Sequence, residues 1–197
     1  MHSTPGRRSC RCTTFHLCLI LALACLFAPQ LEARSHAPEA STPTIPAVHA
    51  TALSGDPVNL PEALQGKIGI LILGFSEHSR DQVTPWGKRL ATDYRTAPRV
   101  LYYEMPVLAS VPHLLRPMVL HSLKSSVPER AQPRFVPVTE DERRWQALTH
   151  YTSSAADDAY LLVVDQAGRV LWRTQGPPTD TTYAALKQQI DTLSTHL

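Results

Sequence analysis

Cysteine is missing from most of this chain. All four cysteines lie within its first 25 residues, and none follows Cys25. If this N-terminal stretch is an export signal that is removed, the mature chain has no thiol. Dithiol redox chemistry, peroxide reduction by a thiolate and thiolate ligation of a metal are then excluded, because each needs a cysteine sulfur.

The N-terminus has the features of an export signal. Three arginines between residues 7 and 11 precede an apolar run over residues 17–28, which is too short to cross a bilayer comfortably. We expect cleavage after Ala37, with Ala33 as second choice, and therefore a periplasmic or secreted protein. An uncleaved membrane anchor, or a lipoprotein attached through Cys25, is the minor alternative.

Net charge is also small. The whole chain has a formal net charge of +2, but residues 1–37 contain four Arg and one Glu, so the remainder carries −1. This balance gives no reason to expect nucleic acid or an anionic membrane surface as a partner.

The rest of the chain has the composition of one domain with a short lead-in. Residues 38–47 are small, polar and Pro-rich, which predicts a flexible segment between the signal 1–37 and the fold. Residues 48–197 contain no internal repeat and no second hydrophobic core. We therefore expect a single domain over 48–197.

The strongest structural signal is the apolar stretch of residues 67–75. It has one charged residue and no alternation of polar and apolar residues, which is typical of a strand buried on both faces. Four polar residues follow it, before an expected helix: Ser76, Glu77, His78 and Ser79. We call these four residues the corner. Open α/β sheets place ligand-binding and catalytic groups at such a strand end.

Hydrophobic periodicity predicts alternating strands and helices in the domain. The expected elements are a hairpin over 48–60, a helical turn at 61–66, the strand 67–75, a helix 84–95, a strand 99–105, a proline-interrupted helical segment 106–126, an edge strand 134–138, a helix opened by a capping box at 139–142 and ending near 150, a hairpin over 159–173, and a last helix capped by Thr179 or Asp180. Thr84 and Pro85 favour a helix start there; a start at Ser79 would place Pro85 inside the helix. This order predicts one α/β layer domain.

Two segments resemble a known family. Residues 72–76 with Trp86 form one segment, and residues 159–172 form the other, in which a tyrosine-led strand ends in Asp, turns at Gly and returns to Trp. The chain resembles the thioredoxin-like fold, with a central mixed sheet, helices on both faces and a C-terminal β-hairpin plus helix. Within it, the chain is similar to the mitochondrial ATP-synthase membrane-sector assembly factor family and its bacterial relatives.

The resemblance implies a protein that assembles or stabilises a partner without redox chemistry. The cysteines of a thioredoxin-like site would lie near residues 76–80, where this chain has none. The usual cis-proline before the hairpin is also missing, since Asp157 and Asp158 stand there.

Two chemical interpretations compete with a contact role. In a hydrolytic site, Ser76 or Ser79 would be the nucleophile, His78 its base and Glu104 the carboxylate that orients the base. However, the second glycine of a nucleophile elbow is missing. Serines that satisfy free N–H groups at the helix start explain the same pattern. A copper or zinc site would use three side chains whose spacing does not bring the two histidines together as i, i+4 ligands: His113, Met118 and His121.

We therefore predict an exported, non-redox protein that acts through protein–protein contact, in an assembly or chaperone-like role. The lack of thiols favours a non-enzymatic role, and we expect no cofactor and no bound metal. The partner would be a protein, for instance within a membrane or envelope complex; the oligomeric state is left open. The expected contact surface is the corner together with Glu104 and Met105. A small-molecule-binding protein or thiol-independent enzyme using the corner is the alternative, and an envelope metal carrier is the third.

Overall fold

The structure, a computed structural model, describes residues 42–195. The predicted export signal 1–37 and both of its expected cleavage sites lie outside the described residues. In the part of the chain that is described, no helix combines the length and the apolar character needed to span a bilayer.

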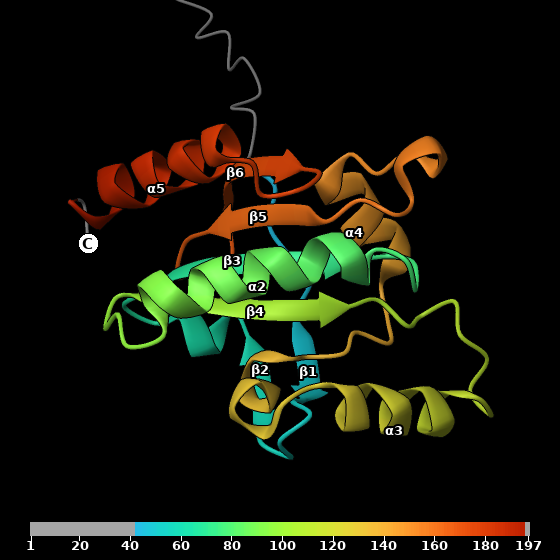
Figure 1. Cartoon of the computed structure of the whole chain (residues 1–197). Coiled ribbons are helices and arrows are strands. Elements are labelled where there is room, and N and C mark those ends of the chain that lie inside the picture. The colour runs from blue at the N-terminus through green and yellow to red at the C-terminus, as the bar shows by residue number, and fades with distance from the viewer. Residues whose placement is uncertain (1–41, 196–197) are drawn as a thin grey trace, which may run out of the picture. The chain divides into compact units, whose positions relative to one another are not determined.

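A four-stranded mixed sheet forms the centre of the domain (Figure 1). Its spatial order is β4–β3–β5–β6, where β3 is Ile68–Gly74, β4 is Val100–Pro106, β5 is Tyr160–Val164 and β6 is Val170–Gln175. Strands β3 and β4 are parallel, whereas β5 runs antiparallel to both of its neighbours. Every residue of the two inner strands β3 and β5 is buried, which is why their sequences are apolar without alternation.

Both faces of the sheet are covered. Helices α2 (Arg80–Tyr94) and α5 (Asp180–Ser194) pack on one face, against side chains such as Ile70, Ile72 and Leu161. The hairpin of β1 (Val48–Thr51) and β2 (Pro57–Leu60) packs on the other face together with α4 (Glu142–Thr149). This arrangement confirms the predicted α/β class with a central mixed sheet, helices on both faces and a C-terminal hairpin plus helix.

The remaining elements are short. A single turn of 3-10 helix, η1 (Glu62–Leu64), links the hairpin to β3, as expected. Helix α3 (Arg116–Ser126), η2 (Glu129–Arg134) and η3 (Ser153–Ala155) lie in the connections between the longer elements. The loop between β5 and β6 is closed by Asp165, whose Oδ1 accepts hydrogen bonds from the N–H groups of Ala167 and Arg169 at 2.9 and 2.8 Å.

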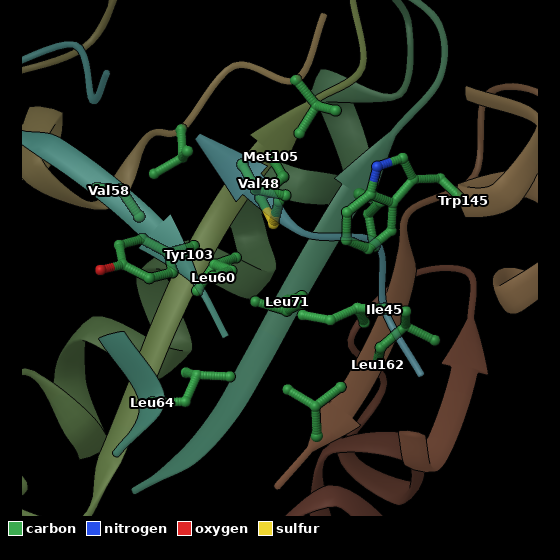
Figure 2. Close-up of a cluster of buried hydrophobic side chains, with 14 of the residues drawn as sticks. Ile45, Val48, Val58, Leu60, Leu64, Leu71, Tyr103, Met105, Trp145 and Leu162 are labelled. Carbon is green, nitrogen blue, oxygen red and sulfur yellow. The ribbon is translucent and has the colours of Figure 1, made fainter. Parts of the chain in front are cut away.

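The hairpin side of the sheet contains the larger apolar cluster (Figure 2). Leu71, Met105 and Leu162 point from the sheet toward Leu60 of β2 and Trp145 of α4. The Trp145 side chain is fully buried, and its Nε1–H has no hydrogen-bond partner among the residues described. Trp145 therefore acts as an apolar filler between α4 and the sheet.

Trp86 ties α2 to the turn after β6. The predicted apolar face of α2 is buried, and Trp86 at its centre has no exposed surface. Its Nε1–H donates to the carbonyl oxygen of Gly176 at 2.9 Å. Trp172, on β6, packs against the apolar cluster between the sheet and helices α2 and α5, but it is only partly buried. Trp86 is therefore a core residue, and Trp172 lies at the edge of that core.

The start of α2 differs from the favoured prediction. The helix begins at Arg80, with Ser79 at the N-cap position, so Pro85 lies inside it. Pro85 has no N–H and removes one hydrogen bond of the helix. The earlier helix start offsets this lost hydrogen bond. It adds a hydrogen bond from the Val83 N–H to the Ser79 carbonyl at 2.9 Å, and it places the Val83 side chain in the core.

The proline-interrupted segment after β4 contains a helix, as predicted, but this helix packs little against the sheet. Helix α3 has no buried residue, and Leu115 and Met118 are 48% and 64% exposed. Residues 134–138 form no continuous strand; instead the N–H groups of Val136 and Val138 donate to carbonyls of β4 at 2.8 and 2.9 Å. The segment nevertheless runs along the β4 edge of the sheet, where the edge strand was expected.

Two local predictions also fail near the ends of elements. The capping box at 139–142 does not form, because α4 begins at Glu142 after Asp141, a left-handed residue (φ 57°) that makes no side-chain cap bond. The part of the lead-in that is described is held by the fold rather than free. The Ile45 N–H donates to the Gly168 carbonyl at 2.9 Å, and the Ile45 side chain is buried. The cap of α5 is as predicted: Thr179 accepts from the Thr182 N–H.

Replacing Trp86 by Phe tests the tie between α2 and the β6–α5 turn. The change leaves the buried Gly176 carbonyl without its donor, which alone costs about 1–3 kcal/mol. We expect a loss of at least this size in the free energy of unfolding, measured by urea denaturation. Trp172→Phe is the matched control and should cost clearly less, because that side chain is partly exposed. Equal losses for the two variants would contradict the tie.

Candidate functional site

The corner is a turn closed by its own two serines. The Ser79 N–H donates to Ser76 Oγ at 3.0 Å, and Ser79 Oγ–H donates to the Ser76 carbonyl at 2.7 Å. The Ser79 side chain is 3% exposed and lies against Gly74, where an added Cβ would overlap its hydroxyl oxygen. Ser76 therefore satisfies an N–H group at the entry to α2, as expected, whereas the Ser79 hydroxyl satisfies a carbonyl and makes no side-chain cap bond.

The loop before β5 is bound to this corner. Ser76 Oγ–H donates to Asp157 Oδ1 at 2.6 Å. Gln82, on the first turn of α2, donates from Nε2 to Asp158 Oδ1 at 2.9 Å and accepts at Oε1 from the Ala159 N–H at 3.3 Å. Asp157 and Asp158 stand where the cis-proline of a thioredoxin-like site was expected. The two acidic residues thus join the loop before β5 to the corner and the first turn of α2, the two segments that would flank a redox site.

The sequence pattern gave no role to Gln82. The signal that was present is its position three residues after Ser79, which places it on the first turn of α2 beside the corner. Its partner Asp158 lies 76 residues away in the sequence. Only the fold brings the two together.

The six residues of the expected contact surface do not form one surface. Glu77 and His78 are exposed, and Ser76 is half-buried. Three side chains are buried instead, at 3%, 6% and 0% exposure respectively: Ser79, Glu104 and Met105. The surface that remains accessible at the corner is therefore Ser76, Glu77 and His78.

The alternation of side chains along β4 explains why both Glu104 and Met105 are buried. Successive side chains of a strand point to opposite faces. Met105 enters the apolar cluster on the hairpin side, and Glu104 points to the opposite face, beneath α2. Both faces are covered at this point of the sheet, so neither side chain reaches the surface.

The carboxyl group of Glu104 is buried and has no charged partner among residues 42–195. Its two oxygens lie against Gly87 of α2, where any Cβ would overlap them. Burial raises the pKa of Glu104 to about 8. The side chain is therefore mainly protonated and neutral at pH 7. Gly87 is the position on α2 that leaves room for it.

The groups of the hypothesised hydrolytic site are not brought together. The hydroxyl of Ser76 donates to Asp157 and that of Ser79 to a carbonyl, so both hydroxyl protons are already used. His78 is exposed, and Glu104 is packed under α2. This arrangement provides no activated nucleophile.

The histidines of the hypothesised metal site are exposed and separate. His113 lies beside Arg116, with its Nδ1 3.3 Å from Nη1. Met118 and His121 are exposed on α3. Within residues 42–195, no three His, Cys, Asp or Glu side chains are grouped so that they could hold a metal ion.

Two open cavities lie elsewhere, on either side of α4. One has a volume of about 340 Å³ and lies between residues 43–44, α4 and β6. The other, of about 570 Å³, is lined by residues 141–144 with Ala109 and Gln146. No residue of the corner lines either cavity.

Comparison with known families gives one match. The family model described as ATP10 protein matches residues 33–193, which includes nearly all of the described domain. The comparison with curated proteins gave no match.

Comparison with solved structures supports the fold. BsSco, described as a member of the Sco family of cytochrome c oxidase assembly proteins, aligns over 79% of this chain and 95% of its own, with a TM-score of 0.54 and 14% identity. A putative protein disulfide isomerase from Bacteroides thetaiotaomicron aligns over 76% of this chain and 87% of its own (TM-score 0.51, 16% identity). The thioredoxin domain of a thiol-disulfide oxidoreductase from Bacteroides vulgatus covers 76% and 96% (TM-score 0.51, 14% identity). The chain has a thioredoxin-like fold.

Replacing Glu104 by Gln tests the buried neutral carboxyl. The folded state keeps a proton that the unfolded chain releases near the ordinary value of 4.5, since the folded pKa is about 8. The stabilisation is fully present below pH 4.5 and is lost as pH rises through 8, at a slope of up to about 1.4 kcal/mol per pH unit. Gln stays neutral, so Glu104→Gln should gain stability relative to the parent chain across this window.

The measurement is the melting temperature of both chains from pH 5 to pH 9. Glu77→Gln is the matched control, because Glu77 is exposed, and its difference from the parent chain should not depend on pH in this way. A constant difference between Glu104→Gln and the parent chain would show that the carboxyl is not held neutral by the fold.

Proposed function

Because the chain belongs to the ATP10 protein family, we propose that it assists the assembly of a protein complex through direct contact and without thiol chemistry. The observation that carries this proposal is the family match over residues 33–193, together with a corner that contains no cysteine. The partner is a protein, in a membrane or envelope complex. The chain is exported, as the arginines and the apolar run of its first 37 residues indicate.

The build of the corner supports a role without redox chemistry. At this place a thioredoxin-like enzyme would present two thiols; here Ser76 and Ser79 close the turn, and Ser76 is also bound to Asp157. The hydrogen bonds of Gln82 to Asp158 and Ala159 also join the start of α2 to the loop before β5. The site is thus a structural joint in which hydrogen bonds engage the hydroxyl groups of both serines.

The exposed residues of the joint favour contact over catalysis. Glu77 and His78 are exposed on a turn whose backbone is held on two sides by hydrogen bonds. A backbone that is already ordered loses little conformational entropy when it binds a partner. An exposed position also favours the contact role over the alternative of a small-molecule site, which would need His78 in a concave pocket with a carboxylate partner.

Alanine replacement of both Glu77 and His78 tests this surface. We expect capture of the partner from the solubilised native envelope, by crosslinking and pull-down with the tagged chain, to fall at least fivefold. The melting temperature should stay nearly unchanged, because exposed substitutions usually alter stability by less than about 0.5 kcal/mol.

The double replacement of His121 and Glu129 by alanine is the matched control. It also removes one exposed histidine and one exposed acid, but from α3 and η2. It should leave capture unchanged. Undiminished capture by the Glu77 and His78 variant, or an equal loss for the control, would refute the contact surface.

A further inference from the structure

The cavity between α4 and β6 is lined by hydrogen-bond donors. Its volume is about 340 Å³, and its polar walls come from three parts of the chain: Thr44, Arg144, His150 and Arg173. The other lining residues are apolar, and no carboxylate of the described residues contributes to the wall. Such a lining has an excess of positive charge.

The walls are held in place by the fold. Residues 43–45 run antiparallel to the start of β6, where the Val170 N–H donates to the Pro43 carbonyl at 2.8 Å and Thr44 forms a bridge with Arg169. Arg173 lies on β6, and Arg144 lies on α4, which packs against the same part of the sheet. The cavity is therefore framed by three fixed backbone segments.

Arg173 is oriented by the end of α4. Its Nη1 donates to the Leu148 carbonyl at 2.9 Å and also contacts Nε2 of His150. An arginine can only donate, so Nε2 of His150 is the acceptor in this contact. Only Nη1 of Arg173 is engaged by residues 42–195, which leaves the rest of its guanidinium for a ligand.

A purely structural explanation accounts for only part of this arrangement. A basic side chain that donates to the last carbonyls of a helix is a common C-terminal cap, and it offsets the partial negative charge of that helix end. This explains the bond from Arg173 to Leu148. It does not involve Arg144, whose exposed side chain forms no ion pair or hydrogen bond with residues 42–195 and is available to a ligand.

We propose that this cavity binds a phosphate group, either as inorganic phosphate or as the monoester of a small molecule or lipid headgroup. Guanidinium groups donate two parallel N–H bonds to phosphate oxygens, and two of them on one cavity favour phosphate over a singly charged anion. The hydroxyl of Thr44 is a further hydrogen-bond donor on the cavity wall, besides the two guanidinium groups. The apolar side of the cavity, at Pro43 and Ala147, accommodates the organic part of a monoester.

The proposal is tested by titrating the full chain with inorganic phosphate, followed by isothermal calorimetry at constant ionic strength. We expect saturable binding, and Arg144→Gln should weaken it at least tenfold. Arg143→Gln is the matched control: it removes the same charge one residue away, and should change the affinity less than twofold, because Arg144 lines both cavities whereas Arg143 lines only the other one. Arg144 and Arg143 are both exposed, so both variants should fold, which their melting temperatures check.

Three further arms separate the sources of the ligand. Glycerol 3-phosphate represents a soluble monoester, vesicles containing phosphatidic acid represent a lipid headgroup, and acetate represents a simple carboxylate. Tighter binding of one phosphate source than of inorganic phosphate identifies that source. Absence of saturable phosphate binding, equal weakening by the two arginine variants, or equal affinity for acetate would each overturn the proposal. The corner takes no part in this site, so failure here leaves the proposed assembly role untouched.

Discussion

The structure depends on the burial of β3 on both faces. A strand without a polar side cannot lie at a surface, so both faces of the sheet must be covered. Helices α2 and α5 supply one cover, and the β1–β2 hairpin with α4 supplies the other. The same requirement sets the end of β3. The corner begins where the chain is no longer covered on both faces, and Glu77 and His78 are exposed there.

The corner contains no cysteine, although the chain shares its fold with proteins that are described as thiol enzymes. Two of the solved structures that share the fold are described as a disulfide isomerase and a thiol-disulfide oxidoreductase. In this chain the corner has serines, and hydrogen bonds join Ser76 to Asp157 and Gln82 to Asp158. A fold does not determine an activity; the residues placed on it do. Here those residues form a joint with Glu77 and His78 exposed on it.

Polar groups below the surface show how tightly the layers are fitted. Glu104 is accommodated only because residue 87 is glycine, and its carboxyl is kept mainly neutral by burial. Ser79 fits only because residue 74 is glycine. The two glycines are thus packing positions, where the sheet and α2 approach closely. On the other side of the sheet, Arg173 joins α4 to β6 by donating to the Leu148 carbonyl.

Local signals in the sequence determined the strand 67–75, the β5–β6 hairpin, the Thr179 cap and the absence of thiols after Cys25, because periodicity, turn residues and composition act over a few neighbours. Tertiary structure decided what lies far apart in sequence. It set the start of α2, buried Glu104 and Met105, exposed α3, and paired Ser76 with Asp157, 81 residues away. Burial depends on which segments cover a residue, and no short stretch of sequence contains that information. The corner was therefore located by sequence alone, whereas its function as a joint required the fold.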